Sequence, residues 1–311
     1  MPIEKLLDIY LPLLLWTGLG WLLGRWLPST VPKVIGKGLF WVGVPVGIVA
    51  FLRHAPVTWS LWIAPVIAWV AAWLGLLGAK LYLHYRRPAW SRRTRTSFFL
   101  TTMVGNTAYI GFPVSLILVG SEYFTWAVFY DLMGSTPNAY GVGVALAANT
   151  QAQENPTGSQ SIPVWRSLLT TMAANPAFWS FAIGLAARDV LLPEWLELGL
   201  RGIAWGVISL ALVLVGMRLS QLKSLRYLHP ALVSLSLKMI AIPLLMGLLL
   251  QAFGIVGAVH QVILLQIAMP PAFATLVISE AYDLDPEMAV TTIAIGSILL
   301  LLLLPLWLWL F

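Results

Sequence analysis

The sequence predicts an all-α integral membrane protein with ten transmembrane helices. Hydrophobic residues make up 59% of the 311 residues and charged residues only 10%, against roughly 25% charged residues in soluble domains. Apolar runs of about 20 residues, the length that crosses a bilayer, use most of the chain. The ten runs begin near Leu6, Val34, Trp59, Ser97, Tyr123, Ser167, Trp195, Leu228, Gly257 and Pro286.

The first run, from Leu6 to Trp26, is a retained span. Acidic residues precede it and no small-residue cleavage site follows it, so no signal peptide is predicted. The breaks between the later runs are short, except for the polar stretch from Asn149 to Pro163. The predicted domains are therefore a first five-helix half over residues 1–148, a loop over 149–163 and a second half over 164–311.

Lys and Arg residues fall mainly on one side of the predicted membrane. With ten spans, one side collects Arg25, Lys33, Lys37, Lys80, Arg86, Arg87, Arg92, Arg93, Arg95, Arg166, Arg218, Lys223 and Arg226. The other side collects only Lys5, Arg53, Arg188 and Arg201. Cytoplasmic loops are enriched in these residues, so the first side is cytoplasmic and both termini lie outside. The net charge of +6 thus reports topology, and no nucleic acid partner is expected.

Five spans in each half give the two halves opposite orientations, as in transporters with inverted repeats. The fourth span and its successor read GNTAYIGFPVSLILVGSEYFTWAV, and the ninth and its successor read MPPAFATLVISEAYDLDPEMAV. Both stretches contain a proline-interrupted apolar segment, an acidic turn and a further span. The similarity is loose, and it favours an internal duplication.

The fourth span carries helix-disrupting residues at its centre, in the stretch MVGNTAYIGFP from Met103 to Pro113. Pro113 lacks a backbone donor, and Gly105 and Gly111 lower helix propensity, so the segment is expected to kink or unwind. Pro270 and Pro271 predict the same for the ninth span. Such residues are also common in ordinary membrane helices, but paired interruptions in corresponding positions indicate a transport site.

The predicted substrate site lies where these two broken helices cross. Their amino ends would favour an anion, and Asn106 and Thr107 would add polar side chains. Gln266, one turn before Pro270, either lines this site or bonds a neighbouring helix.

Several motifs in a fixed order make the chain resemble the auxin efflux carrier family, as a short bacterial-type member related to the plant PIN-FORMED carriers. The motifs are GNTAYIGFP, YDL at 130–132, NPAFWSFAIGL at 175–185, LVGMRLS, LKMIAIPLL and AMPPA. The resemblance implies two inverted five-helix repeats akin to the bile acid sodium symporter fold. Helices 1, 2, 6 and 7 would form a scaffold, and helices 3, 4, 5, 8, 9 and 10 a transport domain that moves against it as an elevator.

The resemblance also implies a site at the helix 4 and 9 crossover, with the family asparagine on Asn106, one proline on Pro113 and the other on Pro270 or Pro271. Many members carry a second asparagine after the helix 9 proline. This chain has Ala274 there, followed by Thr275, so Thr275 or Gln266 is expected to replace the amide. A homodimer through the scaffold is a further expectation.

Two ionisable residues lie deep in predicted spans. Asp131 is about nine residues into the fifth span, roughly 14 Å along a helix, and Lys238 lies at comparable depth in the eighth. Such charges are costly and usually paired or pathway-lining, so they are expected to form either a structural pair or a proton-sensitive switch. Glu280, near the end of the ninth span, is expected to be a solvated loop charge, with a coupling-cation ligand as the alternative.

The function that the sequence favours is secondary transport of small organic anions, such as auxin-like or dicarboxylic acids, through a plasma (inner) membrane. An anion channel or membrane ligand sensor of the same fold is the alternative. The chain has no HExxH, GxSxG or phosphate-binding glycine loop, so it is not expected to be an enzyme. Neither a cofactor nor a metal site is expected, and the membrane lipid is a partner. The coupling ion, a proton or sodium, is left open.

Overall fold

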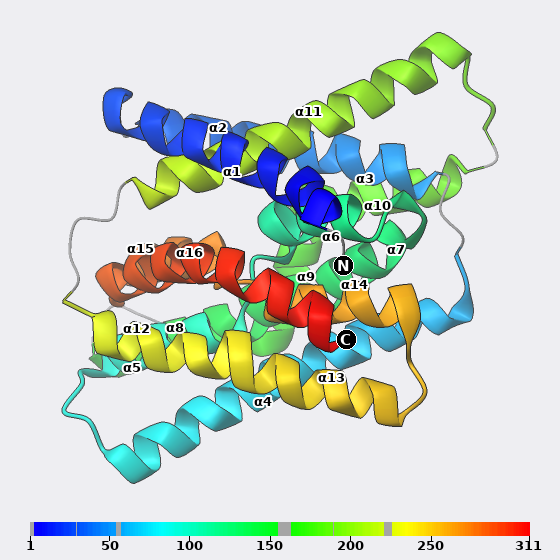
Figure 1. The fold of residues 1–311 in the computed structure, drawn as a ribbon. Helices are drawn as coiled ribbons and strands as arrows, with labels where there is room; N and C mark the ends of the chain where they lie inside the picture. The colour runs from blue at the N-terminus through cyan, green and yellow to red at the C-terminus, as the bar shows by residue number, and fades with distance from the viewer. Residues whose placement is uncertain (1–2, 29, 54–56, 155–162, 189, 221–225) are drawn as a thin grey trace. The chain divides into compact units, whose positions relative to one another are not determined.

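A computed structural model describes residues 3–28, 30–53, 57–154, 163–188, 190–220 and 226–311, and the regular elements in these ranges are helices (Figure 1). Residues 155–162 of the expected 149–163 loop lie outside the described residues. The all-α prediction is confirmed.

Five described segments are long and apolar enough to cross a membrane, which fits a multi-pass membrane protein. They are Thr30–Leu52, Trp59–Arg86, Glu194–Leu219, Leu228–Ala252 and Pro286–Leu310. A sixth is present if Val164–Ala174 and Pro176–Ala186, bent by 59° relative to each other, form one span. The fourth and ninth expected spans are broken, leaving the short apolar helices Thr107–Leu118 and Gly257–Ala268. The count of ten spans and the inverted repeat stay predictions.

The chain divides into two compact units, each built from several stretches of sequence. Unit 1 comprises Met1–Leu61, Ala108–Val128 and Asn175–Leu222. Its helices are α1 (Ile3–Trp26), α2 (Thr30–Gly38), the π-helical turn η1 (Leu39–Gly43), α3 (Val44–Leu52), α6 (Phe112–Leu118), the 3₁₀ turn η4 (Ser121–Tyr123), α10 (Pro176–Ala186) and α11 (Glu194–Leu219).

Unit 2 comprises Trp62–Thr107, Phe129–Ala174 and Lys223–Phe311. Its helices are α4 (Ile63–Arg86), α5 (Arg92–Met103), the π-helical turns η5 (Asp131–Ser135) and η6 (Asn138–Gly143), α8 (Val144–Glu154), α9 (Val164–Ala174), α12 (Leu228–Leu235), the π-helical turn η7 (Ser236–Ala241), α13 (Ile242–Ala252), α14 (Gly257–Ala268), α15 (Phe273–Ala281) and α16 (Pro286–Leu310). The 3₁₀ turn η2 (Trp59–Trp62), the π-helical turn η3 (Thr107–Gly111) and α7 (Phe124–Tyr130) span the boundaries between the units.

This division does not test the expected scaffold and transport domains. Unit 1 gathers the first, second and seventh expected spans and part of the sixth, but it also holds residues 108–128 from the expected transport helices. The scaffold and moving domain therefore stay predictions.

Several helices begin at residues whose side chains satisfy the first backbone N–H groups. Asn175 accepts a hydrogen bond from the backbone N–H of Ala177 at 3.0 Å, and Pro176 follows it as the first residue of α10. Ser91 does the same for Thr94 at 3.1 Å at the start of α5. In α16 the Asp285 carboxylate accepts from the N–H of Met288 at 3.3 Å.

In unit 1, α1 and α11 lie side by side because glycines let their backbones touch (Figure 1). A Cβ on Gly20 would lie 2.0 Å from the carbonyl oxygen of Val213, and a Cβ on Gly216 would lie 1.9 Å from that of Thr17. Small residues commonly permit such close contact between membrane helices. Helix α3 packs against both α10 and α11.

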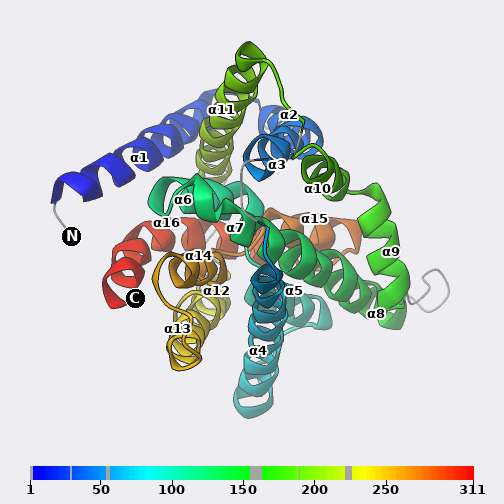
Figure 2. The ribbon, with the colours of Figure 1, turned by 90° about the vertical axis from the view of Figure 1, so that its right-hand side faces the viewer.

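In unit 2, α5 is mostly buried from Thr96 onward and contacts α4, α8, α12, α15 and α16. A Cβ on Gly75 of α4 would lie 2.6 Å from the carbonyl oxygen of Thr102, so this glycine lets α4 approach α5 closely. Helix α14 contacts α13, beside which it lies in Figure 2, and it also contacts α16. These contacts hold the ends of α5 and α14 in the interior.

Gly216→Ala should destabilise the protein, because the added methyl group cannot fit against the backbone of α1. Overpacking of this kind costs about 1–3 kcal/mol. The measurement is the apparent melting temperature in detergent. Gly206→Ala is the matched control on the same helix, since nothing lies within 4 Å of its Cβ position. Equal melting temperatures for the two variants would contradict the close approach of α1 and α11.

Candidate functional site

Two helices of unit 2 stop in the interior, and the extended segments that follow them cross. Helix α5 ends at Met103, and Val104 after it is extended with φ −106° and ψ 121°. Helix α14 ends at Ala268, and Met269 is extended with φ −60° and ψ 142°. Met269 precedes Pro270, and a residue before proline is pushed out of the helical region. The break in the ninth expected span thus follows directly from its sequence.

Backbone hydrogen bonds join the two segments in antiparallel fashion. The N–H of Asn106 donates to the carbonyl of Pro270 at 2.7 Å, and the N–H of Ala272 donates to the carbonyl of Val104 at 3.1 Å. Gly105 and Pro271 lie opposite each other between these bonds. Chain that is not helical thereby satisfies its backbone groups against other protein, as membrane depth requires.

Glycines make the crossing compact enough to be buried. A Cβ on Gly105 would lie 3.2 Å from both Cε and Nζ of Lys238 and 3.5 Å from the carbonyl oxygen of Met269. On the other side, a Cβ on Gly296 of α16 would lie 3.0 Å from Cβ of Pro270. Side chains at either position would push the segments apart.

The structure brings most of the predicted site residues to this crossing. Asn106 and Thr107 follow Gly105 and are each only 2% exposed, and Gln266 and Thr275 flank the proline pair and are fully buried. The Thr275 hydroxyl donates to the carbonyl of Ala272 at 2.7 Å, so it serves the first turn of α15. Whether these side chains bind a substrate stays a prediction.

The prediction that prolines mark the crossing is right for Pro270 and Pro271 and wrong for Pro113. The fourth expected span is interrupted at Val104 to Asn106, and helix resumes in η3 before Pro113 is reached. Pro113 is the second residue of α6, which continues directly from η3 within the helical stretch Thr107–Leu118. It belongs to unit 1, and its predicted contact with substrate stays untested.

Asp131 lies in η5 and is 5% exposed. One carboxylate oxygen accepts a hydrogen bond from the hydroxyl of Thr107, and the other accepts one from the hydroxyl of Thr136 at 3.3 Å. Thr107 is also the first residue of η3. The carboxylate therefore lies beside the amino end of a half-helix, where negative charge is favourable.

Lys238 lies in η7 and is 3% exposed. Its ammonium donates to the carbonyl of Ile267 at 3.1 Å. Within the described residues no ion pair joins Lys238 to Asp131. The hydrogen-bond partners of Asp131 are the two threonine hydroxyls, and that of Lys238 is the Ile267 carbonyl. Gly105 is close to groups that contact both charges. The Thr107 hydroxyl donates to its carbonyl at 3.4 Å, and a Cβ on Gly105 would lie 3.2 Å from Nζ of Lys238. A coupling role for either charge stays a prediction.

The hydroxyl groups around the crossing were not among the site residues expected from the sequence. Ser135 donates to the carbonyl of Gly105 at 3.4 Å, and Thr136 bonds Asp131. Ser234 of α12 lies 3.1 Å from the hydroxyls of both Thr101 and Thr102 of α5. The run GST at residues 134–136, three residues after Asp131 within an apolar span, was the signal available. The π-helical turns that aim these side chains leave no such signal.

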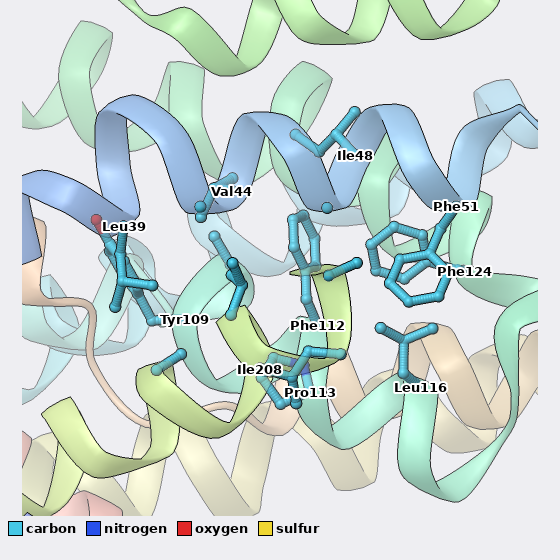
Figure 3. A pocket seen from close by; sticks show the side chains of 16 residues that line it. Leu39, Val44, Ile48, Phe51, Tyr109, Phe112, Pro113, Leu116, Phe124 and Ile208 are labelled. Atoms are coloured by element: carbon cyan, nitrogen blue, oxygen red, sulfur yellow. The ribbon is translucent and has the colours of Figure 1, made fainter. Parts of the chain in front are cut away.

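A second feature, in unit 1, is a small pocket with an almost wholly apolar lining. Figure 3 shows the rings of Phe51, Phe112 and Phe124 gathered at one end of it, and Phe124 lies edge-on to both of the others. Its lining comes from η1, α3, η3, α6, α7 and α11: Leu39, Gly43, Val44, Gly47, Ile48, Phe51, Ala108, Tyr109, Phe112, Pro113, Leu116, Phe124, Ala204, Val207, Ile208 and Ala211.

Charged residues at one end of unit 2 form a separate cluster. Arg93 pairs with Glu154 and, at 2.6 Å, with Asp283. The Glu154 carboxylate raises the pKa of the Arg93 guanidinium through their hydrogen bond. Glu280 is exposed, which agrees with a solvated charge and leaves the cation-ligand alternative without support. No cluster of His, Asp or Glu suited to a metal occurs among the described residues.

Comparison with known proteins matches residues 6–308 to the family described as "Membrane transport protein". An uncharacterized transporter of Methanothermobacter thermautotrophicus is 26% identical over 254 residues, covering 80% of this chain and 78% of the relative. One of Methanocaldococcus jannaschii is 25% identical over 214 residues, covering 68% of this chain and 66% of the relative, slightly under two thirds of its length.

Gly105→Ala should destabilise the crossing, because the new methyl group would press on the Lys238 amine. Overpacking in a buried site costs about 1–3 kcal/mol. The melting temperature in detergent measures this, with Gly78→Ala of α4 as the control, since its Cβ would meet only ordinary contacts, the nearest at 3.4 Å to Leu237. Equal melting temperatures for the two variants would show that a methyl group at position 105 does not press on Lys238.

Proposed function

The chain belongs to the membrane transport protein family, which includes the auxin efflux carriers, and from this premise we propose that it is a secondary transporter of small organic anions. The family resemblance found in the sequence is confirmed. Substrate, coupling and alternating access are the parts that this proposal adds.

The antiparallel crossing of the two broken helices is the observation that supports transport at this position. Interrupted helices whose amino ends meet near the membrane centre are the usual substrate site of secondary transporters. Here the helical turns beginning at Thr107 and Phe273 both follow the crossing directly. The Asp131 carboxylate already lies beside the first of these turns. The first N–H groups and positive dipole end of the turn at Phe273 favour an anionic group, with Asn106 as the neighbouring polar side chain.

The proposed architecture has ten spans in two inverted repeats, with both termini outside the cytoplasm of the plasma (inner) membrane. The crossing supports it, because one interrupted helix precedes and one follows the loop at 149–163. Substrate would be exchanged between the two sides by movement of a transport domain against a scaffold. A homodimer through the scaffold remains an expectation from the family.

The substrate is proposed to be an organic acid, with auxin-like and dicarboxylic acids as the two classes to compare.

An organic acid that binds the crossing should raise the melting temperature of the wild type but not of Asn106→Ala. A ligand of the folded state adds about 2.7 kcal/mol at a hundredfold excess over its Kd. The panel is indole-3-acetate, malate and malonate. Asn149→Ala, at an exposed position, is the control and should respond like the wild type. Equal stabilisation of wild type and Asn106→Ala would remove Asn106 from the site.

Reconstituted protein should show saturable counterflow of the acid found in that screen, since a carrier exchanges substrate without net driving force. Large single-channel currents without counterflow would instead support the channel alternative, because broken helices also line pores. Asp131→Asn tests proton coupling in the same vesicles. If Asp131 exchanges a proton in each cycle, the variant should lose transport or its pH dependence. An unchanged pH profile would exclude that role.

A further inference from the structure

Pro271 cannot supply the hydrogen bond that the Ile267 carbonyl would receive in a continuing helix. There that carbonyl would accept from the N–H group of residue 271. A proline stands at this position and has no N–H. The carboxyl end of α14 therefore presents carbonyl oxygens, with the negative end of the helix dipole, inside unit 2.

Lys238 occupies this carbonyl end. Its ammonium donates to the Ile267 carbonyl at 3.1 Å, which replaces the hydrogen bond that Pro271 cannot make. The side chain is 3% exposed. The missing side chain of Gly105 leaves room for it, since a Cβ there would lie 3.2 Å from Nζ. Gly105 thus provides the space, and Lys238 the positive charge, that place an ammonium group at the carboxyl end of α14.

Backbone carbonyls, rather than a carboxylate, complement this buried charge. Among the described residues Lys238 has no ion pair, and the Asp131 carboxylate is bonded to Thr107 and Thr136. In secondary transporters, unwound carbonyls and the carboxyl ends of half-helices are the places that coordinate a coupling Na⁺. The Lys238 ammonium is a covalently attached monovalent cation at such a position, the carboxyl end of α14.

We propose that Lys238 acts as a built-in replacement for a coupling metal cation. Its ammonium stabilises the carboxyl end of α14 and supplies positive charge behind the crossing, so anion binding requires no Na⁺. This inference rests on the proposed function for its transport consequence. Its structural part, occupation of a cation position by the lysine, stands without a known substrate.

Two truncations of Lys238 separate charge from space. Lys238→Ala removes the ammonium and leaves a cavity lined by the Ile267 carbonyl, which a small cation can enter. Lys238→Met removes the charge but fills the space with an apolar chain. Lys80→Met is the control, because Lys80 is an exposed lysine of α4.

The experiment measures melting temperatures of the wild type and the three variants in NaCl, methylammonium chloride and choline chloride of equal ionic strength. The wild type and Lys80→Met should melt alike in all three salts. Lys238→Ala should melt several degrees lower in choline and recover in methylammonium or Na⁺, whereas Lys238→Met should melt lower in every salt. Recovery of both Lys238 variants, or of neither, would overturn the proposal.

Counterflow of the acid found by thermal screening gives the second readout. Wild-type exchange should be unchanged when choline replaces Na⁺, and Lys238→Ala should be slower by about tenfold in choline and faster again with methylammonium. A wild type that needs Na⁺ overturns the proposal, even if Lys238→Ala does not fold. Failure to find any transported acid counts against the proposed function alone, because the melting temperatures still decide whether Lys238 occupies a cation position.

Discussion

Two adjacent prolines in a buried apolar segment are the constraint on which the interior of unit 2 depends. They stop α14 and deprive the Ile267 carbonyl of its usual intrahelical donor. A backbone group left without a partner at membrane depth would cost several kcal/mol, so the surrounding chain must supply other bonds. The Lys238 ammonium supplies one to the Ile267 carbonyl, and the N–H of Asn106, in the extended segment after α5, supplies one to the Pro270 carbonyl.

The crossing is therefore stabilised by groups from several parts of the sequence. Val104 to Asn106 pair with Pro270 to Ala272, and glycines at 105 and 296 let the neighbouring elements close around them. Three π-helical turns, η3, η5 and η7, carry Thr107, Asp131 and Lys238 next to it. Such turns are frequent at functional sites because they re-aim side chains within a helix.

The two buried charges complement opposite ends of broken helices. Asp131 lies by the first residue of η3, and Lys238 lies at the last turn of α14. Each thus opposes the partial charge of a helix end, which explains how both are tolerated at this depth without a direct ion pair between them in the described structure. An arrangement with fixed internal charges is what an anion carrier without a metal requirement would need.

The sequence by itself determined the helical membrane class, the family and the interruption at Pro270 and Pro271, because apolar run length and the missing N–H of proline act locally. It also identified Asn106, Asp131 and Lys238 as polar groups out of place in apolar spans. Only the tertiary structure decided that the first interruption lies at Gly105 rather than at Pro113. The tertiary structure also decided that Asp131 is hydrogen-bonded by threonine hydroxyls and that Lys238 donates to a backbone carbonyl. These outcomes depend on which segments meet in space, and residue type alone does not specify that.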